Sequence, residues 1–580
     1  MKKLSSYFKG YRKKAVMAPL FKCLEACFEL LVPLVVAYMI DYGIGKNDVN
    51  CIGKMAGILI LLAIIGAACS LTAQYFAAKT AVHVGSSIRK ELFGRMMKLE
   101  YEDIDQVGTS TLMTRITSDV NQVQTGINMF LRLFMRSPFI VFGSVIMAFT
   151  VDTKAALVFV VTVPVLAVIV FVIMLSTMPL YKNVQKQTDE VLSVTRENLK
   201  GTRVIRAFNR QESEKKKFAG ENDKLVSMQI FVGRISALLN PLTCLVVNVA
   251  VIVLLFAGGK EVNTGILTQG QVVALVNYML QILTELVKLA DLIILITKAS
   301  ACYLRVQDVL DLPMKLEREE ACEKREGFLS FEDVSFSYEE GAKESLKNIS
   351  FAIEEGETVG VIGGTGSGKT TLINLIPRFY DVTKGRICVN GKDVKSFHVD
   401  NLREMIGMVP QKAALFRGTI KENLLWGKED ATLEELNEAL RISQAKEFVD
   451  KDRDGLEKRI EQGGRNLSGG QKQRLSIARA LVRKPKILIL DDSSSALDYM
   501  TDARLRQELE KSKDGRTTFI VSQRVNSVQD ADRILVLDAG ELVGNGTHEE
   551  LLKTCEVYKE ICQSQLSGKE GASYGESKEA

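Results

Sequence analysis

The sequence predicts a multi-domain protein: an all-α transmembrane domain of about six helices, with long cytosolic helical extensions, followed by an α/β domain. The chain has 580 residues, which is too long for a single hydrophobic core. Hydrophobic residues make up 47% of it although 25% are charged, as in a chain that is half membrane protein and half soluble domain. The long apolar segments end near Asp311, where short alternating strand patterns and a glycine-rich loop begin.

These changes in composition predict the domain boundaries. The predicted parts are a basic amphipathic elbow helix over residues 1–14, the transmembrane domain over 15–311, a polar linker over 312–327, the α/β domain over 328–566 and a polar tail without regular structure over 567–580.

The clearest membrane span is the uncharged run from Ala156 to Ser176, which is long enough to cross a hydrocarbon core of roughly 30 Å. The first and last candidate spans are more polar and carry Glu25 and the series Glu285, Lys288 and Asp291. Such residues either line a water-filled cavity or lie paired and solvated near the inner membrane surface, and the sequence leaves both readings open.

Two long segments near residues 83–133 and 181–234 carry most of the lysines and arginines of the first half. The positive-inside tendency therefore places these segments and both termini in the cytosol of a multi-pass protein of the cell membrane.

Composition also excludes some functions. The formal net charge of +5 is small for this length and does not indicate nucleic-acid binding. The ten cysteines show no metal-ligand spacing, so we expect reduced thiols that behave as small apolar residues.

The glycine-rich loop predicts a phosphate site. A buried strand precedes it, a helix pattern follows, and the loop fits the spacing G-x-x-x-x-G-K-[ST], which predicts that ATP binds here with Mg²⁺. Backbone N–H groups of the loop surround phosphate oxygens, Lys369 supplies a positive charge and the Thr370 hydroxyl binds the metal. The predicted ATP-binding residues in this loop are Gly363, Gly364, Thr365, Gly366, Ser367, Gly368, Lys369, Thr370 and Thr371.

A second apolar strand, Ile487 to Leu490, runs directly into Asp491 and Asp492. A carboxylate at the end of a buried strand is costly unless a cation meets it, and a magnesium ion beside the phosphate loop does so. We therefore expect Asp491 to bind the metal.

The run "LSGGQ" resembles the signature of ATP-binding cassette (ABC) proteins, and it comprises Leu467, Ser468, Gly469, Gly470 and Gln471. The resemblance implies that Gln411 contacts metal and γ-phosphate, that Asp498 belongs to a loop facing the partner site and that Tyr338 stacks on adenine. The first half, including the coupling-loop-like run "YEDIDQVGTSTLMTRITSDVNQV", resembles one half of an ABC exporter of the type IV, multidrug type.

The sequence departs from that family at two catalytic positions. Asp492 stands where the family has glutamate, and Gln523 stands where it has histidine. The family's glutamate and histidine support the attack of water and stabilise the charge that develops. The two changes together therefore predict a site that binds ATP and hydrolyses it poorly.

In the family, each ATP lies between one chain's phosphate loop and the other chain's signature. A degenerate site with an intact signature resembles the degenerate-site subunit of bacterial heterodimeric ABC exporters. The resemblance implies a second half-exporter as partner and an amphipathic drug, lipid or peptide as substrate. A homodimer with two weak sites and an ATP-gated regulatory membrane protein remain as alternatives, while fusion of the two domains disfavours an importer.

Overall fold

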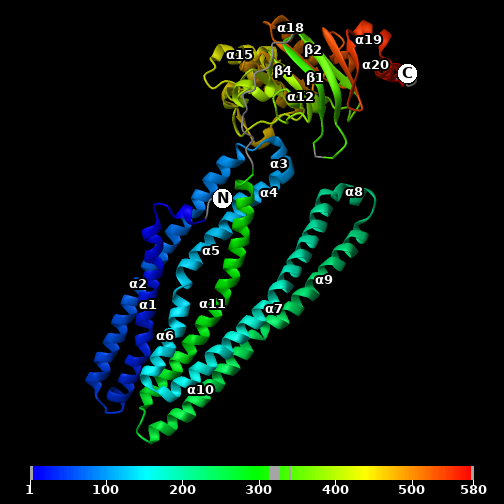
Figure 1. Ribbon diagram of the computed structural model, residues 1–580. Coiled ribbons are helices and arrows are strands. Elements are labelled where there is room, and N and C mark those ends of the chain that lie inside the picture. Colours follow the sequence, from blue (N-terminus) through cyan, green and yellow to red (C-terminus); the bar gives the residue numbers. More distant parts are fainter. Residues whose placement is uncertain (1–3, 313–326, 339–340, 576–580) are drawn as a thin grey trace. The chain divides into compact units, whose positions relative to one another are not determined.

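The computed structural model describes residues 4–312, 327–338 and 341–575, which form two compact units (Figure 1). Unit 1 comprises Met1–Lys98 and Val107–Leu312, and unit 2 comprises Leu99–Gln106 and Pro313–Ala580. The predicted linker lies almost entirely outside the described residues.

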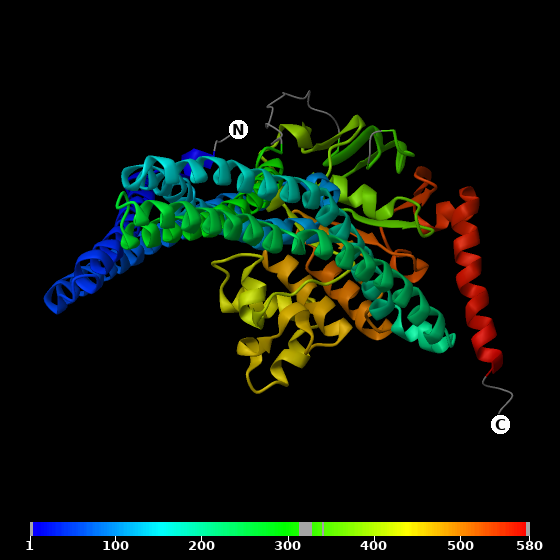
Figure 2. The same ribbon diagram turned by 90° about the horizontal axis from the view of Figure 1, so that it is seen from below.

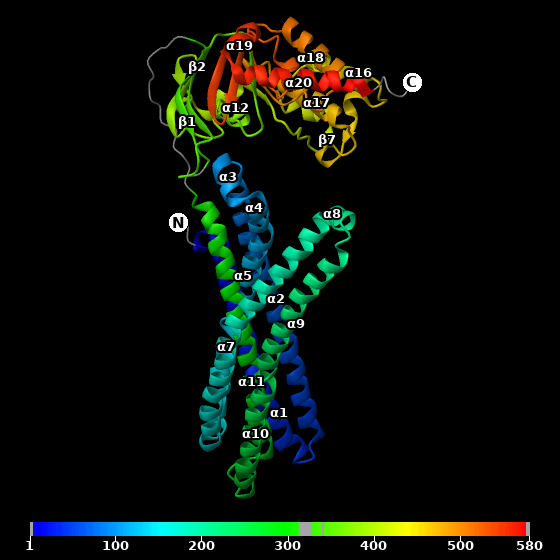
Figure 3. The same ribbon diagram turned by 90° about the vertical axis from the view of Figure 1, so that its right-hand side faces the viewer.

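Unit 1 is helical throughout its described part. Its long helices are α1 (Arg12–Tyr38), α2 (Val49–Met96), α5 (Val120–Leu133), α6 (Arg136–Val151), α7 (Thr153–Lys200), α9 (Gln211–Ala237), α10 (Leu239–Asn263) and α11 (Gln269–Leu310). Short helices connect them: η2 (Met39–Ile44), α4 (Thr109–Thr114), η3 (Arg115–Asp119) and α8 (Thr202–Ala207). The helix α8 lies at the tip of the hairpin that α7 and α9 form (Figure 3).

Within the described residues, five helical stretches are long and apolar enough to cross a membrane. They are Arg12–Ile44, Val49–Met96, Thr109–Val151, Thr153–Lys200 and Gln211–Asn263. The sixth predicted span falls in α11, whose 42 residues extend over roughly 63 Å at 1.5 Å per residue. This helix is long enough to cross a bilayer, and it carries the charged residues Glu285, Lys288 and Asp291.

The predicted helix over residues 1–14 is not continuous. Residues Leu4–Phe8 form the 3₁₀ helix η1, and α1 begins only at Arg12. Gly10 adopts a φ of 82°, a left-handed conformation that interrupts a right-handed helix at this point.

The ends of α1 and α11 are joined by a single carboxylate. Asp41 Oδ1 accepts a hydrogen bond from the Gly270 backbone N–H at 2.7 Å, and Asp41 Oδ2 accepts one from Thr268 Oγ1 at 2.5 Å. A Cβ atom on Gly270 would lie 2.2 Å from the Ala37 carbonyl oxygen, so only glycine permits this close helix approach.

The charged residues of the polar spans are largely paired. Glu285 is 3% exposed and accepts hydrogen bonds from Arg136, Lys288 and Ser137, while Glu25 forms an ion pair with Lys22. Asp291 is exposed and lies outside this cluster. The spacing of three in the sequence therefore identified the Glu285–Lys288 pair, but not the contact of Glu285 with Arg136 or the separate position of Asp291.

Unit 2 is built on a six-stranded sheet. Its strand order is β12 (Glu541–Gly546), β11 (Arg533–Asp538), β3 (Thr358–Gly363), β10 (Thr517–Val521), β9 (Ile487–Asp491) and β6 (Ile406–Val409), and all neighbours except β11 and β12 pair in parallel. Along β9, Ile487 and Ile489 pack into one core while Leu488 and Leu490 pack into another. Burial on both faces explains the unbroken apolar run in the sequence.

A second, antiparallel sheet contains β2 (Leu346–Ile353), β1 (Leu329–Phe336), β4 (Lys384–Val389) and β5 (Lys392–Asp393). The short strands β7 (Gly418–Thr419) and β8 (Arg459–Ile460) form a separate antiparallel pair. The helices are α12 (Lys369–Leu375), α13 (Val399–Glu404), α14 (Ile420–Leu425), α15 (Leu433–Ile442), α16 (Lys446–Asp450), α17 (Gly469–Val482), α18 (Tyr499–Lys511), α19 (His548–Thr554) and α20 (Glu556–Gly575).

The predicted tail is partly helical. The helix α20 continues to Gly575, into the segment expected to lack regular structure (Figure 2). Residues 576–580 lie outside the described part of the chain.

The segment Leu99–Gln106, which contains most of α3 (Tyr101–Val107), belongs to unit 2 although it lies between helices of unit 1 in the sequence. The Tyr101 ring lies 4.3 Å from the Phe379 ring, and Tyr380 Oη donates a hydrogen bond to Asp105 Oδ2 at 2.6 Å. This segment is the start of the coupling-loop-like run in the sequence.

We expect Gly270→Ala to lower the thermal unfolding midpoint of the detergent-purified protein, because the added methyl group would force α11 away from α1 at a cost of about 1–3 kcal/mol. Gly259→Ala is the matched control, since a Cβ atom there meets nothing within 4 Å. Alanine favours a helix over glycine, so the control should unfold at the same or a higher temperature. Equal midpoints for the two variants would show that the contact is unimportant.

Candidate functional site

The predicted phosphate loop connects β3 to α12 in a conformation that requires glycine. Gly366 and Gly368 have φ values of 80° and 100°, in the left-handed region. A Cβ atom on Gly368 would lie 2.8 Å from Leu346 Cδ2, and one on Gly363 would lie 2.1 Å from the Leu537 carbonyl oxygen. The loop is thus held close to β2 and β11 while its outer side faces a cavity of about 490 Å³.

Lys369, the first residue of α12, is only 9% exposed. Its Nζ donates hydrogen bonds to the carbonyl oxygens of Gly363 at 2.9 Å and Gly364 at 2.6 Å. Burial lowers the pKa of this ammonium group, and the charges of Asp492 and Asp491 act in the opposite direction. The lysine is therefore held inside the loop by the loop's own carbonyl groups.

Asp491 ends β9 and is 4% exposed. Thr370 Oγ1 donates a hydrogen bond to Asp491 Oδ1 at 3.3 Å, which brings together the two predicted metal ligands. Burial raises the pKa of the Asp491 carboxyl, and the neighbouring Asp492 charge adds to this effect. A carboxyl group with a raised pKa beside a lysine with a lowered pKa marks a site whose charges are incompletely compensated.

Asp492 follows in a strained conformation with a φ of 44°. Its backbone N–H donates to the Val521 carbonyl oxygen at 2.9 Å, and its Oδ2 accepts a hydrogen bond from Gln411 Nε2 at 3.2 Å. The predicted catalytic position and the predicted γ-phosphate sensor are therefore in direct contact.

Gln523 follows β10 and lines the same cavity as the phosphate loop. Its backbone is held by Gln565 of α20, whose Nε2 donates to the Gln523 carbonyl oxygen at 2.7 Å and whose Oε1 accepts from the Val525 N–H at 2.9 Å. The sequence does not predict this role for Gln565. Nothing in the polar C-terminal helix distinguishes the one glutamine that contacts the loop after β10 from its other polar residues.

The structure brings most of the predicted site residues together. The cavity is lined by the loop residues Thr365, Gly366, Ser367, Gly368, Lys369, Thr370 and Thr371 and by Gln411, Asp491, Asp492 and Gln523. Five further lining residues were not predicted as site residues: Lys343, Glu344, Ser345, Ser522 and Ala539.

Tyr338, the predicted adenine-stacking residue, is 43% exposed and lies beside the cavity rather than among the lining residues. Its hydroxyl lies 3.0 Å from Thr371 Oγ1, and its ring packs edge-on against Tyr380 at 5.2 Å. The exposed ring is thus fixed next to the phosphate loop.

The signature residues lie elsewhere on unit 2, and none of Leu467–Gln471 lines the cavity. Ser468 caps the N-terminus of α17: its Oγ accepts from the Gln471 N–H at 3.3 Å, and Gln471 Oε1 accepts from the Ser468 N–H at 3.0 Å. Asp498 caps α18 in the same manner, with Oδ2 accepting from the Thr501 N–H at 3.0 Å. Both helix starts are exposed, so they are available to a second molecule.

The donor set fits a nucleotide with a hard cation. A buried carboxylate and a hydroxyl are oxygen ligands of the kind that Mg²⁺ prefers, and a helix N-terminus with a buried lysine suits phosphate groups. The burial of Asp491, which is 4% exposed, supports this fit, because a bound cation would offset the cost of holding its charge away from water.

Comparison with known proteins identifies the family. Residues 16–286 match the ABC transporter transmembrane region, and residues 346–495 match the ABC transporter domain. The chain is 38% identical to the uncharacterized ABC transporter ATP-binding protein YfiB of Bacillus subtilis over 99% of this chain and 100% of that protein. It is 34% identical to an uncharacterized ABC transporter ATP-binding protein of Mycobacterium tuberculosis strain H37Rv, over 97% of each chain.

The fold has a solved counterpart in a bacterial Atm1-family ABC exporter with ATP bound. That structure superposes with a TM-score of 0.79 and 22% identity, and the match covers 96% of this chain and 99% of the other. The predicted fold class, a helical transmembrane domain followed by an α/β nucleotide-binding domain, is therefore confirmed. The chain belongs to the ABC transporters, as a multi-pass membrane protein whose second unit is the transport ATPase domain.

Proposed function

We propose that this chain is one subunit of an ATP-driven exporter that moves amphipathic compounds out of the cytosol, and that its own nucleotide site hydrolyses ATP slowly. The observation that carries the proposal is that Asp492 and Gln523, the two departures from the family pattern, line the same cavity as the phosphate loop. If the two residues lay at separate places in the fold, their replacement would not point to slow hydrolysis at one site.

Asp492 is poorly placed to activate water. Its side chain is one methylene shorter than glutamate, so its carboxylate retreats by roughly 1.5 Å. Its backbone is fixed by the hydrogen bond to Val521, and its Oδ2 is held by Gln411, so little local movement can recover that distance. A misplacement of this size can lower a rate by about a hundredfold.

Gln523 weakens the same step in a different way. An amide can donate a hydrogen bond to a phosphate oxygen, but it cannot carry a positive charge or transfer a proton as imidazole can. Binding of ATP depends mainly on the loop and Lys369, so these two substitutions should lower hydrolysis far more than affinity.

We also propose Mg²⁺ at this site, held by Thr370, Asp491 and Gln411. When bound, the ion neutralises charge on the phosphate groups. Asp491 supplies the carboxylate and Thr370 orients it through its hydroxyl.

The intact signature supports a heterodimer. Ser468, Gly469 and Gly470 present an exposed, capped helix start on a surface separate from the chain's own cavity. Such a surface suits a nucleotide bound by a partner subunit that has the glutamate and histidine missing here. A homodimer would pair each signature with a weak site instead.

We expect the chain, purified alone and reconstituted in liposomes, to bind ATP and to hydrolyse it slowly. The double variant Asp492→Glu with Gln523→His should raise phosphate release by about tenfold to a hundredfold, because it restores the reach of the base and an ionisable switch residue. Asp514→Glu is the matched control, since Asp514 is an exposed aspartate with a φ of 40° outside the cavity. Brisk, substrate-stimulated turnover by the unmodified chain would refute the proposal.

Gln565 should matter as a positioning residue for the switch loop. In the Asp492→Glu, Gln523→His background, Gln565→Leu removes two hydrogen bonds worth about 1 kcal/mol each, so kcat should fall by up to about thirtyfold with little change in the KM for ATP. Ser564→Ala serves as the control, because its hydroxyl bonds within α20 to Ile561. An unchanged kcat would show that the loop keeps its position without Gln565.

A further inference from the structure

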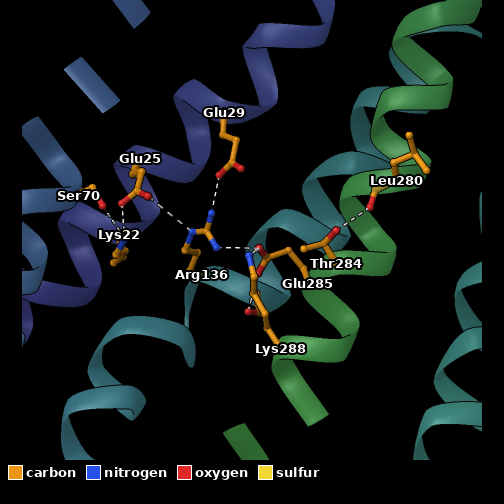
Figure 4. A network of polar contacts seen from close by, with 10 residues as sticks. Lys22, Glu25, Glu29, Ser70, Arg136, Leu280, Thr284, Glu285 and Lys288 are labelled. Carbon is orange, nitrogen blue, oxygen red and sulfur yellow. Dashed lines mark hydrogen bonds and ion pairs between the residues drawn. The ribbon is translucent and has the colours of Figure 1, made fainter. Parts of the chain in front are cut away.

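A cluster of charged side chains connects α1, α6 and α11 within unit 1 (Figure 4). Arg136 lies at its centre: Nη1 donates to Glu285 Oε1 and Nη2 to Glu29 Oε2, both at 2.7 Å, and Nε lies 3.9 Å from Glu25 Oε1. We call the set the membrane charge cluster; its members are Lys22, Glu25, Glu29, Arg136, Glu285 and Lys288.

The position of the cluster along α11 bears on its depth in a bilayer. Asp41 holds the ends of α1 and α11 together at Gly270, and Glu285 lies fifteen residues further along α11, or roughly 22 Å at 1.5 Å per residue. A hydrocarbon core is roughly 30 Å thick, so a helix that enters the bilayer near Gly270 would carry the cluster inside the core, toward its opposite boundary. Charged groups at this depth are costly unless they are paired or face water.

Two members of the cluster, Glu29 and Lys288, have partly exposed side chains, whereas the other four are largely buried. Glu285 accepts from Arg136, Lys288 and Ser137, so its carboxylate is fully engaged. The Glu29 side chain is 39% exposed, and within the described part of the chain only its Oε2 accepts a hydrogen bond. The Lys288 side chain is 41% exposed, and its ammonium has one partner, Glu285.

These two groups, Glu29 and Lys288, line one cavity of about 370 Å³. Its α11 wall carries a polar stripe with the spacing i, i+4, i+7 and i+11, flanked by Leu280 and Glu285; the stripe comprises Asn277, Gln281, Thr284 and Lys288. Apart from Glu29, its other wall is apolar, with Val32, Pro33 and Val36 of α1 and Ile140 of α6.

One buried atom in the cavity wall lacks a partner. Gln281 Oε1 is buried and accepts no hydrogen bond from the described residues. An unsatisfied buried acceptor is unfavourable, so the Gln281 side chain would gain a hydrogen bond by turning toward a donor group in the cavity. The cavity itself offers the Glu29 carboxylate and the Lys288 ammonium group beside an apolar wall.

The charges decide which ligand fits. Lys22, Arg136 and Lys288 carry three positive charges, and Glu25, Glu29 and Glu285 carry three negative charges, so the cluster is formally neutral. A ligand with a net charge would leave an uncompensated charge in a region of low dielectric constant, whereas a zwitterion would not.

We propose that this cavity binds the zwitterionic end of an amphipathic substrate, with its cation at Glu29, its anion at Lys288 and its chain along the apolar wall. The inference rests on the proposed function as an exporter of amphipathic compounds and names the substrate class.

The test measures binding to the nucleotide-free, detergent-purified protein by equilibrium dialysis with four probes that share an octyl chain. They are N-octyl-N,N-dimethylglycine, octyltrimethylammonium, octanoate and octyl glucoside, each below its micelle concentration. We expect the zwitterion to bind at least about tenfold more tightly than the other three, because both of its charges find a partner. Equal affinities, or tightest binding of any other probe, would overturn the proposal without any variant.

Two single substitutions should change the ranking of the probes in opposite directions. Glu29→Gln keeps an acceptor for Arg136 but leaves the cluster with one excess positive charge, so it should weaken the zwitterion about tenfold and favour octanoate. Lys288→Gln leaves one excess negative charge and should favour octyltrimethylammonium. The matched controls, Glu212→Gln and Lys215→Gln, remove the charges of an exposed i, i+3 pair on α9 and should leave the ranking unchanged.

A purely structural role for the cluster predicts a different outcome. The variants would then lower the thermal unfolding midpoint and leave the probe ranking of the wild type intact, which would contradict the proposal. Binding and transport measurements together separate this inference from the proposed function as an exporter. Selective binding without ATP-driven transport would refute only the proposed function, and transport with no charge selectivity would refute only this inference.

Discussion

The nucleotide site depends on one carboxylate that ends a fully buried strand. The apolar side chains of β9 pack into cores on both faces of the sheet, and this packing carries Asp491 to a position where it is 4% exposed. Because β3, β9 and β10 are parallel neighbours, their carboxyl ends meet at one edge of the sheet. The phosphate loop, Asp492 and Gln523 are brought together there, so the fold itself turns three separate sequence motifs into one cavity.

The same packing makes the catalytic position sensitive to a small change. Asp492 takes its place from the end of β9 and from a hydrogen bond to Val521, and it cannot advance to replace the missing methylene without disturbing the sheet. A rigid scaffold that positions a base accurately also prevents a shorter base from reaching its substrate. The exposed start of α17, which carries the signature residues, is built separately from this cavity, so a change at Asp492 leaves its geometry unaltered.

The sequence predicted the two-domain fold and most of the site because local patterns encode them. The apolar spans, the spacing of the phosphate loop from Gly363 to Thr370 and the strand before Asp491 each reflect a nearby physical requirement. The contacts that could not be predicted join residues far apart in the chain: Gln565 with Gln523, and Arg136 with Glu285, which are separated by 149 positions.

The spacing of Glu285, Lys288 and Asp291 drew attention to the correct helix, but it could not show that Glu285 turns toward Arg136 while Asp291 stays exposed. The interrupted helix at Gly10 and the helical tail to Gly575 were likewise not predicted, because a single glycine or a polar run is compatible with both outcomes.

We propose that this chain lends its signature to a working site and keeps a weak site of its own. The most direct measurement compares two variants of the complex that is purified from native membranes through a tag on this chain. In substrate-stimulated ATPase assays, Asp492→Asn should leave turnover within about twofold of the unmodified complex, whereas Ser468→Arg should lower it about a hundredfold, because only the second change reaches the site that turns over. Equal losses for the two variants would show that Asp492 is a working base, and the asymmetric account would then be wrong.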